Sequence, residues 1–348
     1  MKTLCFFAAV AIILLCSDAS PVKKPKVSPS RMFHGRPFGG FLRKPPHDPK
    51  APKVPTRYHD SKVDNFDPSN TKTYKQRYYY NDKWYKPGGP QFLMIGGEGR
   101  EDSYWVDNGN VEWTLLAQEV GAIVFDIEHR FYGDSQPTGD LKFESLKYLT
   151  SEQALADVKN FILDMNVKFN FTNPRWITFG GSYPGALSAW ARQLYPDVIY
   201  AAVASSGPVQ AVVDFTGYLD VVYTALNNYN PACSASVHNG FLKINDLMKT
   251  ESGRKSLSSS FNTCNQIPSD SDNINYFYEA IIGTYMGQIQ YSNPQTIPYL
   301  CSLQMGAGDD LQGVVAVQSM EGGGCLDVDY NGYIAAMSDT SIDGDWSD

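Results

Sequence analysis

Histidine is scarce in this chain, with five residues in 348. Cysteine is nearly as rare, with six, and no two cysteines have the C-x-x-C spacing of a structural zinc site. His238 is the one histidine near the cysteines, so a metal centre explains them poorly. The sequence therefore predicts no metal site, and it contains no sign of a cofactor.

Long apolar runs are absent beyond the N-terminus. Lys2 precedes an apolar run from Leu4 to Leu15, and small residues follow up to Ser20. This pattern over residues 1–20 is typical of a secretory signal peptide and is too short to span a bilayer. We therefore expect a secreted protein with no membrane span; a buried N-terminal helix is the alternative.

Basic charge is concentrated in one short segment. Residues 22–57 carry ten Lys or Arg and one Asp, a net charge of +9. Lys2 and Asp18 cancel in the first twenty residues. Because the whole chain has a net charge of −8, residues 58–348 carry −17. This strong negative charge on residues 58–348 argues against a nucleic acid partner. Residues 21–57 also hold nine prolines and few apolar residues, so we expect an extended or disordered tail. A basic binding arm or a removable pro-segment is the alternative.

Four cysteines remain once the signal peptide is removed, and all lie in the last third of the chain: Cys233, Cys264, Cys301 and Cys325. An even number in a secreted chain predicts two disulfides, with three pairings open. Asn170 begins an N-glycosylation sequon before an expected strand, which is plausible on a surface loop.

The stretch 176–187 carries the strongest chemical signal. A short apolar strand runs into Gly180-Gly181-Ser182, and a helix begins near Pro184, a residue that a first helical turn tolerates. A serine on such a turn is exposed beside backbone N–H groups that can bind an oxyanion. We expect Ser182 to be a nucleophile, although the last glycine of the G-x-S-x-G pattern stands at 185. An incidental serine in a glycine-rich turn is the alternative.

Strands and helices alternate over residues 90–205, which predicts an α/β fold with a mostly parallel sheet covered on both faces. The expected strands are 73–80, 91–95, 122–127, 175–179 and 201–204, with a hairpin turn at Asn81-Asp82 and helices at 111–119 and after Thr150. Ligands of such sheets bind at the carboxyl ends of the strands. We therefore expect backbone N–H groups of Gly97 and Glu98 to join that of Tyr183 in an oxyanion hole; a plain turn at 96–99 is the alternative.

The pattern changes after Gly207. Residues 209–348 show helix-like stretches at 212–227, 241–248 and 274–286 and no convincing buried strand. We expect residues 58–208 to form the N-terminal part of the sheet domain. We expect residues 209–348 to form a helical, disulfide-bearing domain that is inserted as a lid over the active site. A separate helical domain without a catalytic role is the alternative.

Several motifs resemble one family of serine peptidases, that of prolyl carboxypeptidase and dipeptidyl peptidase II, which includes the thymus-specific serine protease. Its nucleophile region resembles Gly180-Gly181-Ser182-Tyr183-Pro184-Gly185 and the residues 189–196 that follow. Its E-H-R-[FY]-Y-G-x-S segment is similar to residues 128–135, and residues 92–99 and 148–157 fit as well. The matches keep the family's order over residues 58–215 and are looser up to residue 340. Pro184 departs mildly, because glycine is common there.

The resemblance implies an α/β-hydrolase core with an inserted helical lid in a secreted or lysosomal enzyme. It implies cleavage of peptides after proline or a small residue through an acyl-enzyme, with Ser182 as nucleophile and Tyr183 supplying an oxyanion N–H. Carboxypeptidase, dipeptidyl peptidase and endopeptidase all stay open. Glu98 could hold the free amino group of a substrate, which would favour release of dipeptides; a surface carboxylate is the alternative.

The sequence offers no clear general base for Ser182. A nucleophilic serine needs a histidine and a carboxylate, which follow it in α/β hydrolases, and His238 in the helical region is the one later histidine. The family carries its Asp and His beyond the helical domain, so this sequence is expected to lack both, together with the closing strands of the sheet. We expect a truncated peptidase with little activity, or else a non-catalytic secreted binding protein. A lipase or esterase is a third alternative, and a homodimer stays open.

Overall fold

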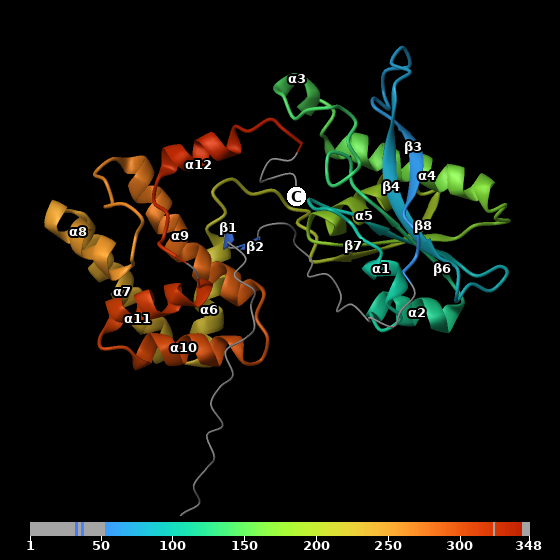
Figure 1. The fold of residues 1–348 in the computed structure, drawn as a ribbon. Coiled ribbons are helices and arrows are strands. Elements are labelled where there is room, and N and C mark those ends of the chain that lie inside the picture. Colours follow the sequence, from blue (N-terminus) through green and yellow to red (C-terminus); the bar gives the residue numbers. More distant parts are fainter. Residues whose placement is uncertain (1–31, 34–35, 38–52, 323, 343–348) are drawn as a thin grey trace, which may run out of the picture.

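The computed structural model describes residues 32–33, 36–37, 53–322 and 324–342. Its elements form a sheet-bearing part, residues 53–208, and a helical part, residues 209–342 (Figure 1). Each part has hydrophobic clusters of its own. The signal peptide predicted at 1–20 lies outside the described residues.

A six-stranded sheet organises the first part. Its strands are β3 (Arg57–Lys62), β4 (Thr73–Asn81), β5 (Gln91–Ile95), β6 (Ile123–Ile127), β7 (Trp176–Gly181) and β8 (Ile199–Ser205). They lie in the order β3-β4-β6-β5-β7-β8. The pairs β3–β4 and β4–β6 are antiparallel, and the remaining neighbours are parallel. This order, with helical crossovers between the parallel strands, confirms the predicted α/β-hydrolase core.

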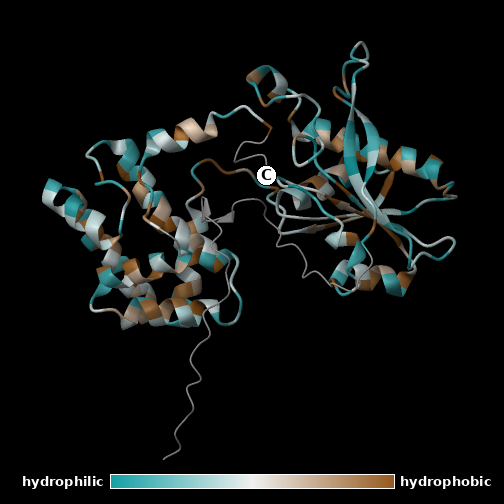
Figure 2. Cartoon of the chain, viewed as in Figure 1, coloured by the Kyte–Doolittle hydropathy of each residue, from teal (hydrophilic) through white to brown (hydrophobic). Residues whose placement is uncertain are grey.

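The central strands β5, β6 and β7 are mostly apolar and almost fully buried, and helices cover both faces of the sheet. One face packs on α4 (Ser151–Lys168) and α5 (Tyr183–Leu194) through a cluster that includes Leu93, Phe125 and Phe161. The other face packs on α1 (Tyr104–Asp107) and α2 (Glu112–Val120) through Phe92 and Trp113. Figure 2 shows hydrophobic residues on these strands and on the helices that cover them. A short helix, α3 (Phe143–Leu146), precedes α4.

The helical part contains seven α-helices among the described residues: α6 (Gly217–Tyr229), α7 (Pro231–Met248), α8 (Glu251–Ser260), α9 (Ser271–Gln290), α10 (Thr296–Gly306), α11 (Asp310–Gln318) and α12 (Tyr330–Met337). A short 3-10 turn, η1 (Ser319–Glu321), follows α11. Their shared core includes Ile244, Phe277, Leu300 and Val314, all fully buried. Among the described residues, no helix is both long and apolar enough to cross a membrane.

Both predicted disulfides form, and both lie in the helical part. Cys233 on α7 pairs with Cys301 on α10, and Cys264 pairs with Cys325. The bridges close loops of 68 and 61 residues, respectively. The sequence left the pairing open, and the structure thus selects one of the three.

One expectation about secondary structure was wrong, and short strands occur within residues 21–57. Residues 83–85 form no strand, so Asn81-Asp82 is not a hairpin turn, and β4 instead pairs with β3 and β6. Strand β3 begins at Arg57, the last residue of the segment expected to be an extended or disordered tail. In the same segment, β1 (Met32–Phe33) and β2 (Arg36–Pro37) pair with each other and lie against α9.

The helix expected after Thr150 is confirmed together with its cap. The Thr150 side chain accepts a hydrogen bond from the backbone N–H of Gln153, which satisfies a donor that the helix itself leaves unpaired. The cap matters for the site below, because it places Ser151 at the first position of α4.

Candidate active site

Ser182 occupies a strained turn between β7 and α5. Its φ of 61° and ψ of −130° lie outside the regions that side-chain-bearing residues prefer. The turn is held from both sides, because the Ser182 N–H donates to Ser205 O at 3.0 Å and its carbonyl accepts from the Ala186 N–H at 3.1 Å. The Ser182 side chain is half-buried and does not cap the helix that it precedes. The strand–turn–helix context expected of a nucleophilic serine is therefore present.

Two glycines make this turn sterically accessible. A Cβ atom on Gly180 would lie 2.1 Å from the carbonyl oxygen of Pro184, and one on Gly185 would lie 2.6 Å from that of Ser205. Neither position can carry a side chain without moving the backbone. The glycine that the close contact with Ser205 requires is residue 185, not residue 184. Position 184 can therefore be proline, in the first turn of α5. This explains the displaced glycine of the sequence pattern.

The glycine loop after β5 lies against the turn. A Cβ atom on Gly97 would lie 2.5 Å from Cγ of Pro184, so the Gly97 backbone is in close contact with the proline ring. The adjacent Glu98 is half-buried, and its negative charge raises the pKa of Tyr183, after the larger effect of burial. The structure thus brings together Ser182, Tyr183, Gly97 and Glu98, the four residues named from the sequence.

Glu128, at the carboxyl end of β6, ties this loop to the sheet. One carboxylate oxygen accepts from the Glu101 N–H at 3.0 Å, and the other accepts from the Ser135 hydroxyl at 2.7 Å. Arg77 forms a buried ion pair with Glu128 and donates to the Glu101 carbonyl. Burial raises the pKa of Glu128, while the Arg77 charge acts in the opposite direction. Sequence analysis gave Glu128 no individual role, since its partners are distant in the chain.

His129 reaches the turn from the same strand end. Its Nδ1 lies 2.7 Å from the carbonyl oxygen of Arg130, and its Nε2 lies 3.1 Å from the Tyr183 hydroxyl. That hydroxyl also lies 3.3 Å from the Ser151 hydroxyl. Both ring nitrogens of His129 are therefore engaged by groups other than Ser182.

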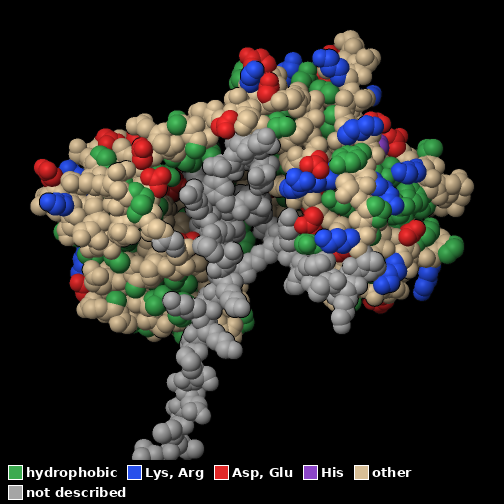
Figure 3. All heavy atoms as spheres, viewed as in Figure 1, with side chains coloured by type: hydrophobic (Ala, Val, Ile, Leu, Met, Phe, Trp, Pro, Cys, Tyr) green, Lys and Arg blue, Asp and Glu red, His purple; other side chains and the backbone are tan. Residues whose placement is uncertain are grey.

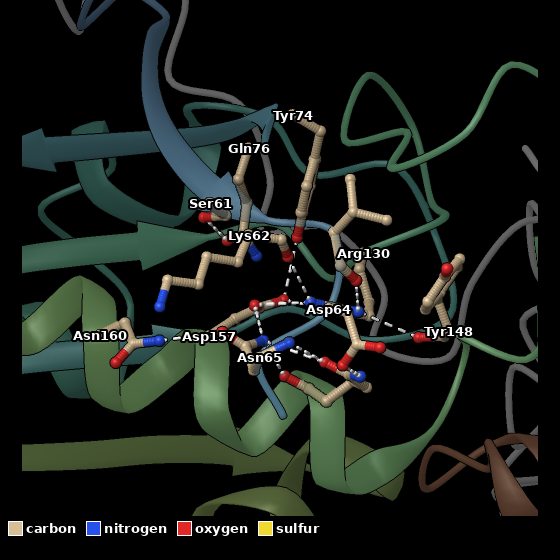
Figure 4. A network of polar contacts seen from close by, with 12 residues as sticks. Ser61, Lys62, Asp64, Asn65, Tyr74, Gln76, Arg130, Tyr148, Asp157 and Asn160 are labelled. Atoms are coloured by element: carbon tan, nitrogen blue, oxygen red, sulfur yellow. Dashed lines mark hydrogen bonds and ion pairs between the residues drawn. The ribbon is translucent and has the colours of Figure 1, made fainter. Parts of the chain in front are cut away.

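Arg130 completes the segment with a buried ion pair (Figure 4). Its Nε and Nη2 donate to the two carboxylate oxygens of Asp157 on α4, at 2.8 and 2.7 Å. The Tyr74 hydroxyl donates to the same carboxylate, and the guanidinium also donates to the carbonyls of Val63 and Tyr148. The pair thus fastens the β3–β4 turn and the start of α4 to the end of β6.

The other histidines do not approach Ser182 in the described structure. His59 lies between Ser61 and Asp164, at 2.8 and 2.7 Å. This set has the composition of a catalytic triad, but Ser61 is buried and donates its hydroxyl to Gln76. His238 is exposed on α7.

His34 and His47 lie outside the described residues. Among the residues that are described, no group of three or more His, Cys, Asp or Glu side chains could hold a metal ion.

Charge divides between the two parts of the molecule. Residues 209–342 carry four Lys or Arg and thirteen Asp or Glu. On the face shown in Figure 3, Lys and Arg side chains gather over the sheet-bearing part and are few over the helical part. Asn170 is exposed in the turn between α4 and β7, with a φ of 51°.

The fold and the turn together define an α/β hydrolase with a serine presented at the edge of its sheet. The chain belongs to the serine carboxypeptidase S28 family, whose model matches residues 61–341.

Curated relatives support this assignment. A candidate serine protease of Caenorhabditis elegans is 42% identical over 98% of this chain and 71% of its own. The human thymus-specific serine protease is 36% identical over 71% of this chain and 49% of its own. The human lysosomal Pro-X carboxypeptidase is 32% identical over 75% of this chain and 54% of its own. The chain thus spans about half the length of the two human relatives.

Proposed function

We propose that this protein is a serine-type peptidase in which Ser182 attacks the carbonyl carbon of a peptide bond. The observation that carries the proposal is the strained, half-buried Ser182 at the start of α5, beside the Gly97 loop. The Tyr183 N–H belongs to the first helical turn, whose amides have no acceptor within the helix. With backbone N–H groups of Gly97 and Glu98, it would bind the oxygen that becomes negative during attack.

The reaction would proceed in two halves. The Ser182 oxygen forms a bond to the carbonyl carbon, the proton of its hydroxyl passes to the peptide nitrogen, and that nitrogen leaves as an amine to give an acyl-enzyme. Water then attacks the ester, and Ser182 regains its proton as the acid leaves.

We propose that turnover by this chain is low, because no described histidine contacts Ser182. An oxyanion hole without a base still leaves about 10³–10⁴-fold acceleration over water in a comparable protease.

The relatives support a proposal for the substrate class. One is named a Pro-X carboxypeptidase, and we infer that this chain acts on peptides at a bond after proline or a small residue. We propose that Glu98 would hold a free amino terminus, since its charge acts on Tyr183 next to Ser182. That role would favour release of dipeptides over release of single C-terminal residues.

We further propose that the helical part acts as a lid and that the protein is secreted or lysosomal. Two connections between the parts support the lid. The chain enters the helical part directly after β8, in which Ser205 accepts the hydrogen bond of the Ser182 N–H. In addition, the Leu141 N–H donates to Thr340 O at 2.9 Å. Two disulfides and an exposed sequon at Asn170 are typical of an oxidising compartment.

A non-catalytic binding protein is the second candidate. It is favoured by the engagement of His59 and His129 with partners other than Ser182.

Peptides that carry proline at the second or the penultimate position, with free or blocked termini, distinguish the candidates. Mass spectrometry of the products, with Ser182→Ala as control, should show cleavage after proline by the wild type alone. Equal products from both proteins would contradict the proposal, and binding without any product would favour the second candidate.

A further inference from the structure

The Tyr183 side chain is held at its hydroxyl by two elements besides its own helix. His129 contacts it from the end of β6, and Ser151 contacts it from the first turn of α4. Tyr183 directly follows Ser182, whose backbone is strained. A group that fixes Tyr183 therefore also restricts the peptide unit that joins these two residues.

The hydrogen-bond partners determine where the protons lie. A carbonyl oxygen can only accept, so His129 Nδ1 carries a hydrogen and donates it to Arg130 O. Burial lowers the pKa of His129 to about 4, so at neutral pH its Nε2 is an acceptor. The Tyr183 hydroxyl then donates to Nε2 and is left to accept from Ser151.

The surroundings of His129 agree with a neutral ring. The side chain is 4% exposed, and the rings of Tyr132 and Tyr183 pack against it with centroids 5.4 and 5.5 Å away. The charged groups that act on it are Asp157 and Arg130, which oppose each other and are weaker than burial. Burial therefore keeps the imidazole ring neutral at neutral pH.

We propose that His129 is a positioning residue that acts through Tyr183: as a neutral acceptor it fixes the Tyr183 hydroxyl and thereby the backbone N–H that faces the oxyanion. The inference rests on the proposed function of Ser182. It assigns His129 no role as a base, because both of its nitrogens are already bonded.

Two variants at one position separate this role from simple packing. His129→Gln can place an oxygen near the former Nε2 and accept from Tyr183. His129→Asn can still donate to Arg130 O, but it is too short to reach the Tyr183 hydroxyl. Tyr183→Phe removes the same bond from the other side and keeps the backbone N–H as a donor, now without the contact that positions it. Tyr195→Phe, at the far end of α5, is the matched control.

The first readout is the rate at which a fluorophosphonate labels Ser182. Loss of one hydrogen bond that orients a reacting group should slow labelling about tenfold in His129→Asn and in Tyr183→Phe. The double variant His129→Asn/Tyr183→Phe should be labelled no more slowly than either single variant, since the two substitutions remove the same hydrogen bond. His129→Gln should recover most of the rate, and Tyr195→Phe should match the wild type. Equal rates in His129→Asn and His129→Gln would overturn the inference.

The second readout does not depend on Ser182. In ¹⁵N-histidine-labelled protein, the ring signals absent from His129→Gln identify His129, and long-range spectra report which nitrogen is protonated. We expect a hydrogen on Nδ1, a bare Nε2 between pH 5 and 8, and a shifted Nε2 signal in Tyr183→Phe. A ring protonated at Nε2, or an unshifted signal, overturns the inference whatever the labelling result. Absence of labelling in the wild type would instead count against the proposed function.

Discussion

Gly97 and Pro184 are in contact across the candidate site, so closely that a Cβ atom on Gly97 would lie 2.5 Å from Pro184 Cγ. The contact joins the loop after β5 to the first turn of α5. It is the direct structural link between the two sources of backbone N–H groups that the proposed reaction requires.

Gly97→Ala should therefore separate the loop from the turn. The added methyl group cannot be accommodated without a backbone shift, which typically costs about 1–3 kcal/mol. We expect fluorophosphonate labelling of Ser182 to fall at least about tenfold while the fold is retained. Gly139→Ala is the control, because a Cβ there meets nothing within 4 Å. Equal labelling of the two variants would mean that the loop takes no part.

Asp157→Asn should be among the most destabilising single changes in the sheet-bearing part. Asp157 and Arg130 are 1% and 0% exposed, so the substitution leaves a buried guanidinium without its countercharge. Removing one partner of such a pair costs about 3–5 kcal/mol. Urea unfolding measures the loss. Lys75→Ala breaks an ion pair with Asp60 in which both side chains are more than half exposed, and it should cost less than about 1 kcal/mol.

Asp126 should make the protein less stable as the pH rises. It is fully buried on β6, and neither of its carboxylate oxygens has a hydrogen-bond partner in the described structure. Burial, and then the charges of Glu101 and Glu128, raise its pKa well above the usual range. The folded state therefore holds a proton that the unfolded state releases above about pH 4, so stability falls as the pH increases.

Asp126→Asn removes this titration. Relative to the wild type, its free energy of unfolding should increase progressively from pH 4 to pH 8, and the difference should be smallest at pH 4. Asp60→Asn, at an exposed position, should show no such trend. A constant difference for Asp126→Asn across the range would mean that Asp126 is ionised in the folded protein.

Replacing Cys264 and Cys325 by serine should destabilise the helical part selectively. The bridge closes a loop of 61 residues, for which chain entropy predicts a contribution of about 4 kcal/mol. Hydrogen exchange should report faster opening of α8 and α9 with little change in β5 to β7. Uniform acceleration in both parts would mean that they unfold as one unit.

The sequence predicts the sheet better than the helical part, for a physical reason. Strands β5 to β7 are apolar runs buried on both faces, which a short window reveals. Strand β3 was missed because the side chains that it buries include His59 and Ser61, which are polar and mutually bonded. Helix α8 was missed because it is mostly Ser, Lys and Arg and buries little beyond Leu257 and Gly253.

The residues of the candidate site also differ in whether the sequence could predict them. Ser182, Tyr183 and the glycine loop could be named because each follows a recognisable strand. The contact of His129 with Tyr183 joins residues 54 positions apart, and the ion pair of Arg130 joins residues 27 positions apart. No local pattern encodes such pairs, because they depend on how the strand ends meet at one edge of the sheet.

The most direct measurement is the position of the covalent adduct after treatment with a fluorophosphonate. The tryptic peptide 176–192 contains two serines, Ser182 and Ser188, and Ser188 is fully buried with its hydroxyl donated to Thr178. Fragment masses distinguish them, and Ser206→Ala controls for an exposed serine nearby. The account predicts an adduct on Ser182 that is lost in Ser182→Ala and kept in Ser206→Ala. An adduct on another residue, or none on the folded wild type, would contradict it.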